Sequence, residues 1–139
     1  MQDIGKLLLR VTLAVLILFH GVDKIIHGIA FIQDPLAGLG LPYWISYGVY
    51  IGEIIAPLFL ILGLGARIAA LVIAINMVMA VILDAHKLAF TINGGGGWGL
   101  ELEALYFITA VTITLIGPGR FRLFANVKPA GAPQSSSPQ

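Results

Sequence analysis

Four apolar stretches, each about as long as a bilayer's hydrocarbon core is thick, constrain the fold of this chain more than any other feature. A helix needs about 20 residues to cross ~30 Å of hydrocarbon. Only 11% of the 139 residues are charged, whereas soluble domains carry about 25%. We therefore predict an all-α protein in which four transmembrane helices form one bundle, at about residues 7–26, 44–64, 68–87 and 100–117.

One domain is expected over residues 1–125, followed by a polar tail at 126–139 whose Ser, Pro and Gly content is typical of disorder. The segment between the first two predicted helices is broken by Pro and Gly, which favours a loop or a short interfacial helix. The glycine-rich loop at 93–99 lacks the GxxxxGK[ST] pattern of a phosphate-binding loop and follows no strand. We predict a flexible tether there, with Trp98 anchoring the fourth helix at the interface.

Composition also excludes several classes of function. The chain has no cysteine, which rules out disulfides, thiol redox chemistry, thiolate-bound zinc and cysteine-held iron–sulfur clusters. A net charge of +1 provides no basic field for nucleic acid. No covalently bound cofactor is expected, so any electrons must be carried by something that the protein binds.

Basic residues indicate the orientation of the bundle. With four spans, both termini and the turn between the second and third helices lie on one side, which the positive-inside rule assigns to the cytoplasm. That side carries six basic residues, and the other side carries Lys24 and Lys87. The localisation predicted is an integral protein of a bacterial cytoplasmic (inner) membrane. The six residues are Lys6, Arg10, Arg67, Arg120, Arg122 and Lys128.

Ionisable residues at the end of the first apolar stretch are the first candidates for a site. His20, Asp23, Lys24 and His27 follow the i, i+3, i+4, i+7 spacing of one helix face. Charged groups within a membrane are costly and turn toward partners. We therefore expect this stripe to face inward and to meet polar groups of the other helices near the outer surface.

Counting along the helices predicts which of these groups meet. Lys24 lies 14 residues after Arg10 (24 − 10), and Glu53 lies 14 residues before Arg67 (67 − 53). At 1.5 Å per residue both stand ~21 Å from the inner arginines, at the same depth. The remaining candidates are His20 and Asn76 at a deeper level, and Glu103, Asp84 and His86 at a shallower one.

Alternative interpretations stay open for these residues. Lys24 and Glu53 are either a buried ion pair that fixes two helices together or a polar anchor and proton relay for a ligand. His20, Lys24, Glu53 and Glu103 are the main ligand-binding candidates, and no residue is assigned a catalytic step. Metal binding is not predicted, because His20 and His27 stand ~10 Å apart along the helix. Asp84 and His86 fit a solvated helix end, together with Lys87.

The chain carries an ordered set of motifs: Arg10, Phe19-x-Gly21-x-x-Lys24, Gly52-Glu53, Leu62-Gly63 through Arg67, Trp98 to Glu103, and Gly117-Pro118-Gly119-Arg120. This set resembles the DoxX family of membrane proteins. The resemblance covers nearly the whole chain except the Ser/Pro tail, and it implies a four-helix integral membrane protein. Relatives in this family include subunits of a thiosulfate:quinone oxidoreductase.

Two functions from different classes follow. The first is a subunit of a quinone-linked oxidoreductase, whose bundle binds a lipid-soluble quinone while a redox partner subunit or a small sulfur substrate supplies electrons. The second is a non-catalytic membrane scaffold or assembly partner in which the buried charges are structural. A transporter would require a homo-oligomer, because four spans show no internal repeat. The expected partners are therefore the lipid bilayer, a redox subunit and a second copy of the chain, and not nucleic acid.

Overall fold

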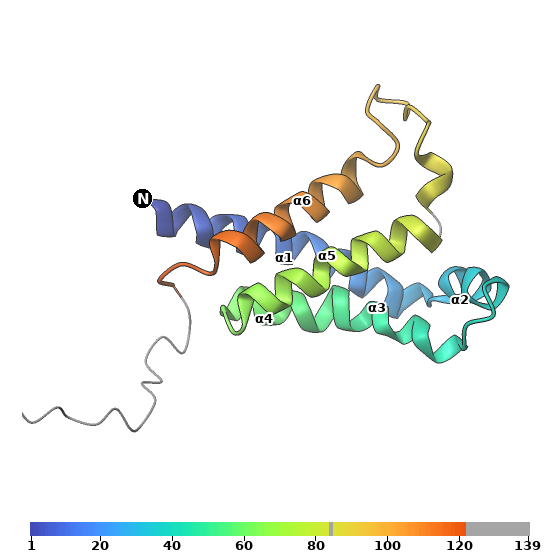
Figure 1. Cartoon of the computed structure of the whole chain (residues 1–139), viewed down its shortest axis with the longest axis horizontal. Coiled ribbons are helices and arrows are strands. Elements are labelled where there is room, and N and C mark those ends of the chain that lie inside the picture. Colours follow the sequence, from blue (N-terminus) through green and yellow to red (C-terminus); the bar gives the residue numbers. More distant parts are fainter. Residues whose placement is uncertain (84, 122–139) are drawn as a thin grey trace, which may run out of the picture.

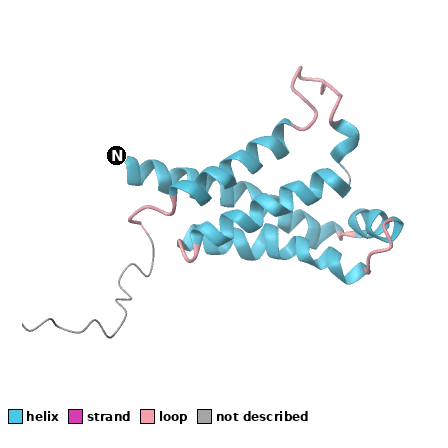
Figure 2. Ribbon diagram, viewed as in Figure 1, coloured by secondary structure: helices cyan, strands magenta, loops and turns pink. Residues whose placement is uncertain are grey.

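The computed structural model describes residues 1–83 and 85–121, and this part of the chain is all-α. Its long helices run side by side along one axis, and a short helix closes one end (Figure 1). Between the helices lie only turns and loops, apart from one isolated bridge between Ile92 and Trp98 (Figure 2). Residue 84 and the tail predicted at 126–139 lie outside the described residues.

Helix α1 (Gln2–His27) is longer than predicted and begins near the N-terminus. Its buried side follows a helical repeat through Arg10, Ala14, Ile17 and Gly21, whereas residues such as Phe19 and Ile25 face outward. The chain then turns at Gly28 into helix α2 (Ala30–Gly38). Of the two possibilities for this segment, loop or short helix, the structure has the helix. Leu36 on this helix packs into the bundle and is only 1% exposed.

The second long helix is continuous from Tyr43 to Leu62 but changes its winding three times. It comprises a 3₁₀ turn η1 (Tyr43–Tyr47), helix α3 (Gly48–Tyr50), a π-helical turn η2 (Ile51–Ile55) and helix α4 (Ala56–Leu62). Pro57 explains the π turn. In a regular α-helix its ring would clash with the carbonyl four residues earlier, that of Glu53. The wider turn avoids this clash, and Ala56 N–H donates to Ile51 O, five residues back.

A tight turn at Gly63 leads into helix α5 (Ala66–Leu83), and α6 (Glu101–Ile116) returns beside it. Gly63 has φ 74°, and the Leu64 N–H bonds to Phe59 O as in a Schellman cap. Small residues on α5 are buried and allow close helix packing, among them Ala69, Ala70 and Ala74. They form one apolar core with α1, α4 and α6.

The loop between α5 and α6 is a compact hairpin rather than an unstructured tether. A 3₁₀ turn η3 (Ala85–Leu88) precedes it. Asn93 organises its apex, because the side-chain Oδ1 accepts hydrogen bonds from the N–H groups of Gly95 and Gly97. The Trp98 indole donates to Ala89 O at 2.7 Å, which closes the hairpin.

The start of α1 and the end of α6 meet at the same end of the bundle (Figure 1). Arg10 joins them: its guanidinium donates to Pro118 O at 3.0 Å and to Phe121 O at 2.7 Å, with a longer contact to Ile61 O at 3.4 Å. The side chain is almost completely buried, with 2% exposure. Asp3 adds a bond by accepting the Arg120 N–H.

Three helices among the described residues are long and apolar enough to cross a membrane: α1, Tyr43–Leu62 and α5. Helix α6 has 16 residues, a rise of ~24 Å, which is shorter than the ~30 Å of a typical hydrocarbon core. Large apolar side chains cover the outside of the bundle, for example Ile68, Leu105 and Leu115. An apolar exterior of this kind is typical of a protein that faces lipid.

Candidate functional site

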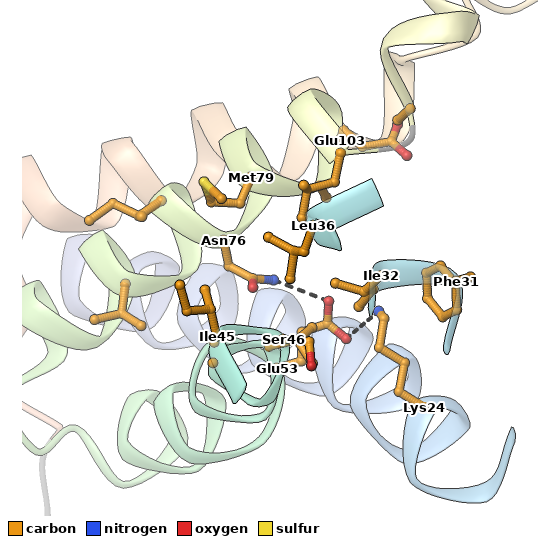
Figure 3. A pocket seen from close by; sticks show the side chains of 18 residues that line it. Lys24, Phe31, Ile32, Leu36, Ile45, Ser46, Glu53, Asn76, Met79 and Glu103 are labelled. Carbon is orange, nitrogen blue, oxygen red and sulfur yellow. Dashed lines mark hydrogen bonds and ion pairs between the residues drawn. The ribbon is translucent and has the colours of Figure 1, made fainter. Parts of the chain in front are cut away.

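Lys24 and Glu53 meet where α1 contacts η2. Lys24 Nζ donates to Glu53 Oε2 at 2.5 Å, and Asn76 Nδ2 on α5 donates to Glu53 Oε1 at 3.1 Å (Figure 3). The Lys24 side chain is 14% exposed and that of Glu53 is 4% exposed. The equal depth predicted for the two charges is thus confirmed, and one carboxylate joins three helices.

Two glycines of the predicted motifs make this meeting possible. A Cβ atom built on Gly21 would lie 2.5 Å from the backbone oxygen of Glu53, and one on Gly52 would lie 2.6 Å from Cγ of Asn76. Both distances are far below a normal carbon contact. Gly21 therefore lets the backbone of α1 approach η2, and Gly52 leaves room for the amide that holds Glu53.

Gly21→Ala is accordingly expected to destabilise the protein by about 1–3 kcal/mol, since overpacking against a backbone cannot be relieved by a rotamer change. Gly5→Ala is the matched control in the same helix. Its Cβ meets nothing within 4 Å, so helix propensity predicts no loss or a gain of about 0.5–1 kcal/mol. Thermal unfolding in detergent micelles measures both. Equal, small effects of the two substitutions would contradict the close contact of α1 with η2.

A cavity of about 400 Å³ opens beside the ion pair. Polar side chains from four helices line it together with many apolar ones, as expected for a site that binds a mainly apolar ligand with a polar head. Lys24 Nζ also lies 5.9 Å from the centre of the Phe31 ring on α2, a cation–π distance. The polar members of the lining are Lys24, Ser46, Glu53, Asn76 and Glu103.

Glu103 is the lining residue whose hydrogen bonding is incomplete. Its Oε2 atom is buried and has no hydrogen-bond partner among the described residues. It is labelled above the Glu53–Lys24 pair in Figure 3, on the α6 side of the cavity. A buried oxygen without a partner costs about 1–3 kcal/mol, and a hydroxyl or other polar group of a ligand would remove that cost.

The rest of the predicted stripe on α1 does not share this site. Asp23 and His27 are exposed and pair with each other, with Nδ1 of His27 2.8 Å from Oδ1 of Asp23. His20 is also exposed and lies edge-on to the Tyr106 ring, with 5.8 Å between centroids. Of the four residues expected to face inward, the structure turns only Lys24 toward the cavity.

His86 is exposed on η3 and does not line the cavity, whereas Asp84 lies outside the described residues. Within residues 1–83 and 85–121, His, Asp and Glu side chains form no group of three that would hold a metal ion. Sequence reasoning missed the contributions of α2 and η1 to the lining. Phe31 and Leu36 lie in a segment whose Pro and Gly content hid its helical pattern.

The model of the DoxX family matches residues 5–87. The chain belongs to the DoxX family. The matched range contains Gly21, Lys24, Glu53 and Asn76, so the whole ion-pair cluster lies in the DoxX region, while Glu103 lies beyond it. This DoxX protein is also 28% identical over 115 residues to a Bacillus subtilis (strain 168) protein named "Putative oxidoreductase CatD", covering 83% of this chain and 81% of that relative. No solved structure matches the chain.

Proposed function

We propose that this DoxX protein is a membrane subunit of a quinone-linked oxidoreductase and that its cavity binds the head group of a quinone. The observation that supports this most is the cavity itself, which places a buried ion pair and an unsatisfied carboxylate oxygen around an otherwise apolar space. A lipid-soluble quinone ring matches the apolar part of that lining, and Lys24 can donate to its carbonyl. The hydroxyl of the reduced form, the quinol, can donate to Glu103. The name of the Bacillus subtilis relative agrees with redox work.

Lys24 is the residue that would orient the ring. An ammonium group has three donors, and Glu53 accepts from it on one side, so further N–H groups remain for a quinone carbonyl. Glu53, which also accepts a hydrogen bond from Asn76, holds the lysine in place. The chain has no cysteine to hold an iron–sulfur cluster; a partner subunit or a small reduced sulfur compound would therefore supply the electrons.

The proposed topology is four spans with both termini in the cytoplasm of a bacterium, in its inner membrane. The contact of Arg10 with Pro118 and Phe121 supports it, because this contact brings the start of α1 and the chain after α6 to the same end of the bundle. If α1 spans the membrane, the chain must then cross the membrane an even number of times. Helix α6 then counts as a short span, lengthened by the chain on either side. Lys6 lies beside Gly119, Arg67 lies beside Gly117, and the Arg120 N–H donates to Asp3, so these three basic residues share that end, in agreement with the positive-inside rule.

Glu103→Gln tests the ligand site. The amide keeps the shape of the side chain but removes the negative charge, and hydrogen bonds to charged groups contribute about 1.5–3 kcal/mol. The reduced form of a quinone, a quinol, carries hydroxyl groups that can donate to the Glu103 carboxylate. A short-chain quinol titrated into the purified protein in detergent, under reducing conditions, is expected to bind Glu103→Gln about ten- to a hundredfold more weakly than wild type. Glu101→Gln, on the exposed side of α6, is the control and should bind as wild type does. Equal affinities in all three proteins would contradict the role of Glu103.

A structural role for the ion pair remains as a second candidate function, because one observation favours it. Both oxygens of Glu53 already have protein partners, which is the arrangement expected of a lock between helices in a scaffold or assembly partner. In that case no quinone binds to the wild-type protein. A stoichiometric protein partner in the purified sample, without a quinone in the lipid extract, would favour this candidate.

A further inference from the structure

The hairpin between α5 and α6 is unusual for a segment outside the bundle, because it is apolar and carries no charge. Residues 88–100 contain no Asp, Glu, Lys or Arg. Phe90 is fully exposed, Ile92 is 77% exposed and Trp98 is 48% exposed. A loop that is surrounded by water would leave these large side chains in contact with solvent at considerable cost.

The same hairpin satisfies many of its polar groups internally. Asn93 N–H donates to Gly97 O at 2.8 Å, and Gly99 N–H donates to Thr91 O at 2.9 Å. The Asn93 side chain accepts hydrogen bonds from the Gly95 and Gly97 N–H groups, and the Trp98 indole donates to Ala89 O. Internal pairing of this kind is what a backbone needs in order to enter an environment poor in water.

The direction of the hairpin fits such an environment. It extends sideways from the end of the bundle, roughly across the axis along which the long helices run (Figures 1 and 2). If those helices cross a bilayer, a segment that leaves the bundle in this direction runs along the membrane surface, over the neighbouring lipids. Trp is enriched at that depth, where its ring and N–H suit the boundary between headgroups and acyl chains.

We propose that residues 88–100 form a membrane-inserting hairpin, whose Phe90, Ile92 and Trp98 side chains enter the interfacial region of the leaflet beside the bundle. The hairpin thereby fixes the ends of α5 and α6, and hence Glu103, relative to the membrane surface. This inference depends on the membrane-spanning helices and not on the nature of the ligand, so quinone binding is not part of its test.

Tryptophan fluorescence tests the proposal in the full chain. The protein has two tryptophans, so Trp44→Phe leaves Trp98 as the reporter. In phosphatidylcholine vesicles, lipids that carry a nitroxide near the headgroup are expected to quench most of the Trp98 emission, while aqueous iodide quenches little of it. Efficient iodide quenching without nitroxide quenching would overturn the proposal. Protection from both quenchers would also overturn it, since a protein surface would then cover the hairpin.

A second variant separates insertion from folding. Phe90→Asn combined with Ile92→Asn, on the Trp44→Phe background, removes two apolar side chains that are mostly exposed, so thermal stability in detergent should not change. In vesicles the Trp98 emission should shift to longer wavelength and become accessible to iodide. Unchanged emission and unchanged quenching in this variant would mean that Phe90 and Ile92 do not hold the hairpin in the lipid, contrary to the proposal.

Discussion

Lys24→Ala is expected to destabilise the protein by about 3–5 kcal/mol, because it leaves the carboxylate of Glu53 buried without its cation. Glu53 is 3% exposed as a whole residue, so water cannot replace the lost partner. Asn76 retains its hydrogen bond to Glu53 but brings no charge. Thermal or denaturant unfolding in detergent micelles measures the loss.

Asp23→Ala is the control for Lys24→Ala, since it removes the neighbouring charge on the same helix. Its side chain is 67% exposed and pairs with the exposed His27. Surface changes of this kind usually stay within about 0.5 kcal/mol. An effect of Lys24→Ala as small as that of Asp23→Ala would show that Glu53 does not depend on Lys24.

Arg10→Met is expected to cost about 3 kcal/mol or more, since charged hydrogen bonds contribute about 1.5–3 kcal/mol each and two good ones are lost. Its guanidinium binds Pro118 O and Phe121 O, and it reaches toward Ile61 O on α4. Methionine retains the apolar stem, so the change isolates the hydrogen bonds. Thermal unfolding in micelles provides the measurement.

Arg67→Met serves as the comparison for Arg10→Met, because Arg67 lies beside Gly117, at the same end of the bundle, but is exposed. We expect it to change stability little. If both arginines contributed equally, Arg10 would be acting as a surface charge and not as the group that joins α1 to the chain after α6.

The depth of the ion pair could be predicted from the sequence because helix rise is regular. Counting 14 residues from Arg10 and from Arg67 predicts that Lys24 and Glu53 lie at one level. In the structure, Lys24 Nζ lies 2.5 Å from Glu53 Oε2. Counting does not determine rotation as well. Positions 23 and 24 point ~100° apart on a helix, and α1 is rotated so that the Lys24 edge of the stripe faces the cavity while Asp23 faces outward.

The small residue Gly21 marks the contacting side of α1, and it shares that side with Lys24 and Ile17 rather than with His20. A Cβ there would meet the Glu53 backbone, so packing, not the polarity of the stripe, determines which charges turn inward. Asp23 and His27 instead remain on the outer side, where they pair with each other.

Of two further features, the first depends on a tertiary contact that no local pattern reveals, and the second depends on a local proline. Helix α2 is only nine residues long, and isolated helices of that length are marginal in water; the burial of Leu36 stabilises it. The π turn at Ile51–Ile55 follows from Pro57. This widened turn points Glu53 at Lys24 and Asn76 together.

The most direct test of the proposed site separates ligand binding by the Lys24–Glu53 pair from the contribution of that pair to stability. In the double variant Lys24→Met, Glu53→Leu, apolar side chains of similar size replace the pair, and such replacements of buried ion pairs are often neutral or stabilising. The protein should then unfold near the wild-type temperature but bind a short-chain quinone about tenfold more weakly or worse. A double variant that is as stable as wild type and binds the quinone equally well would contradict the account.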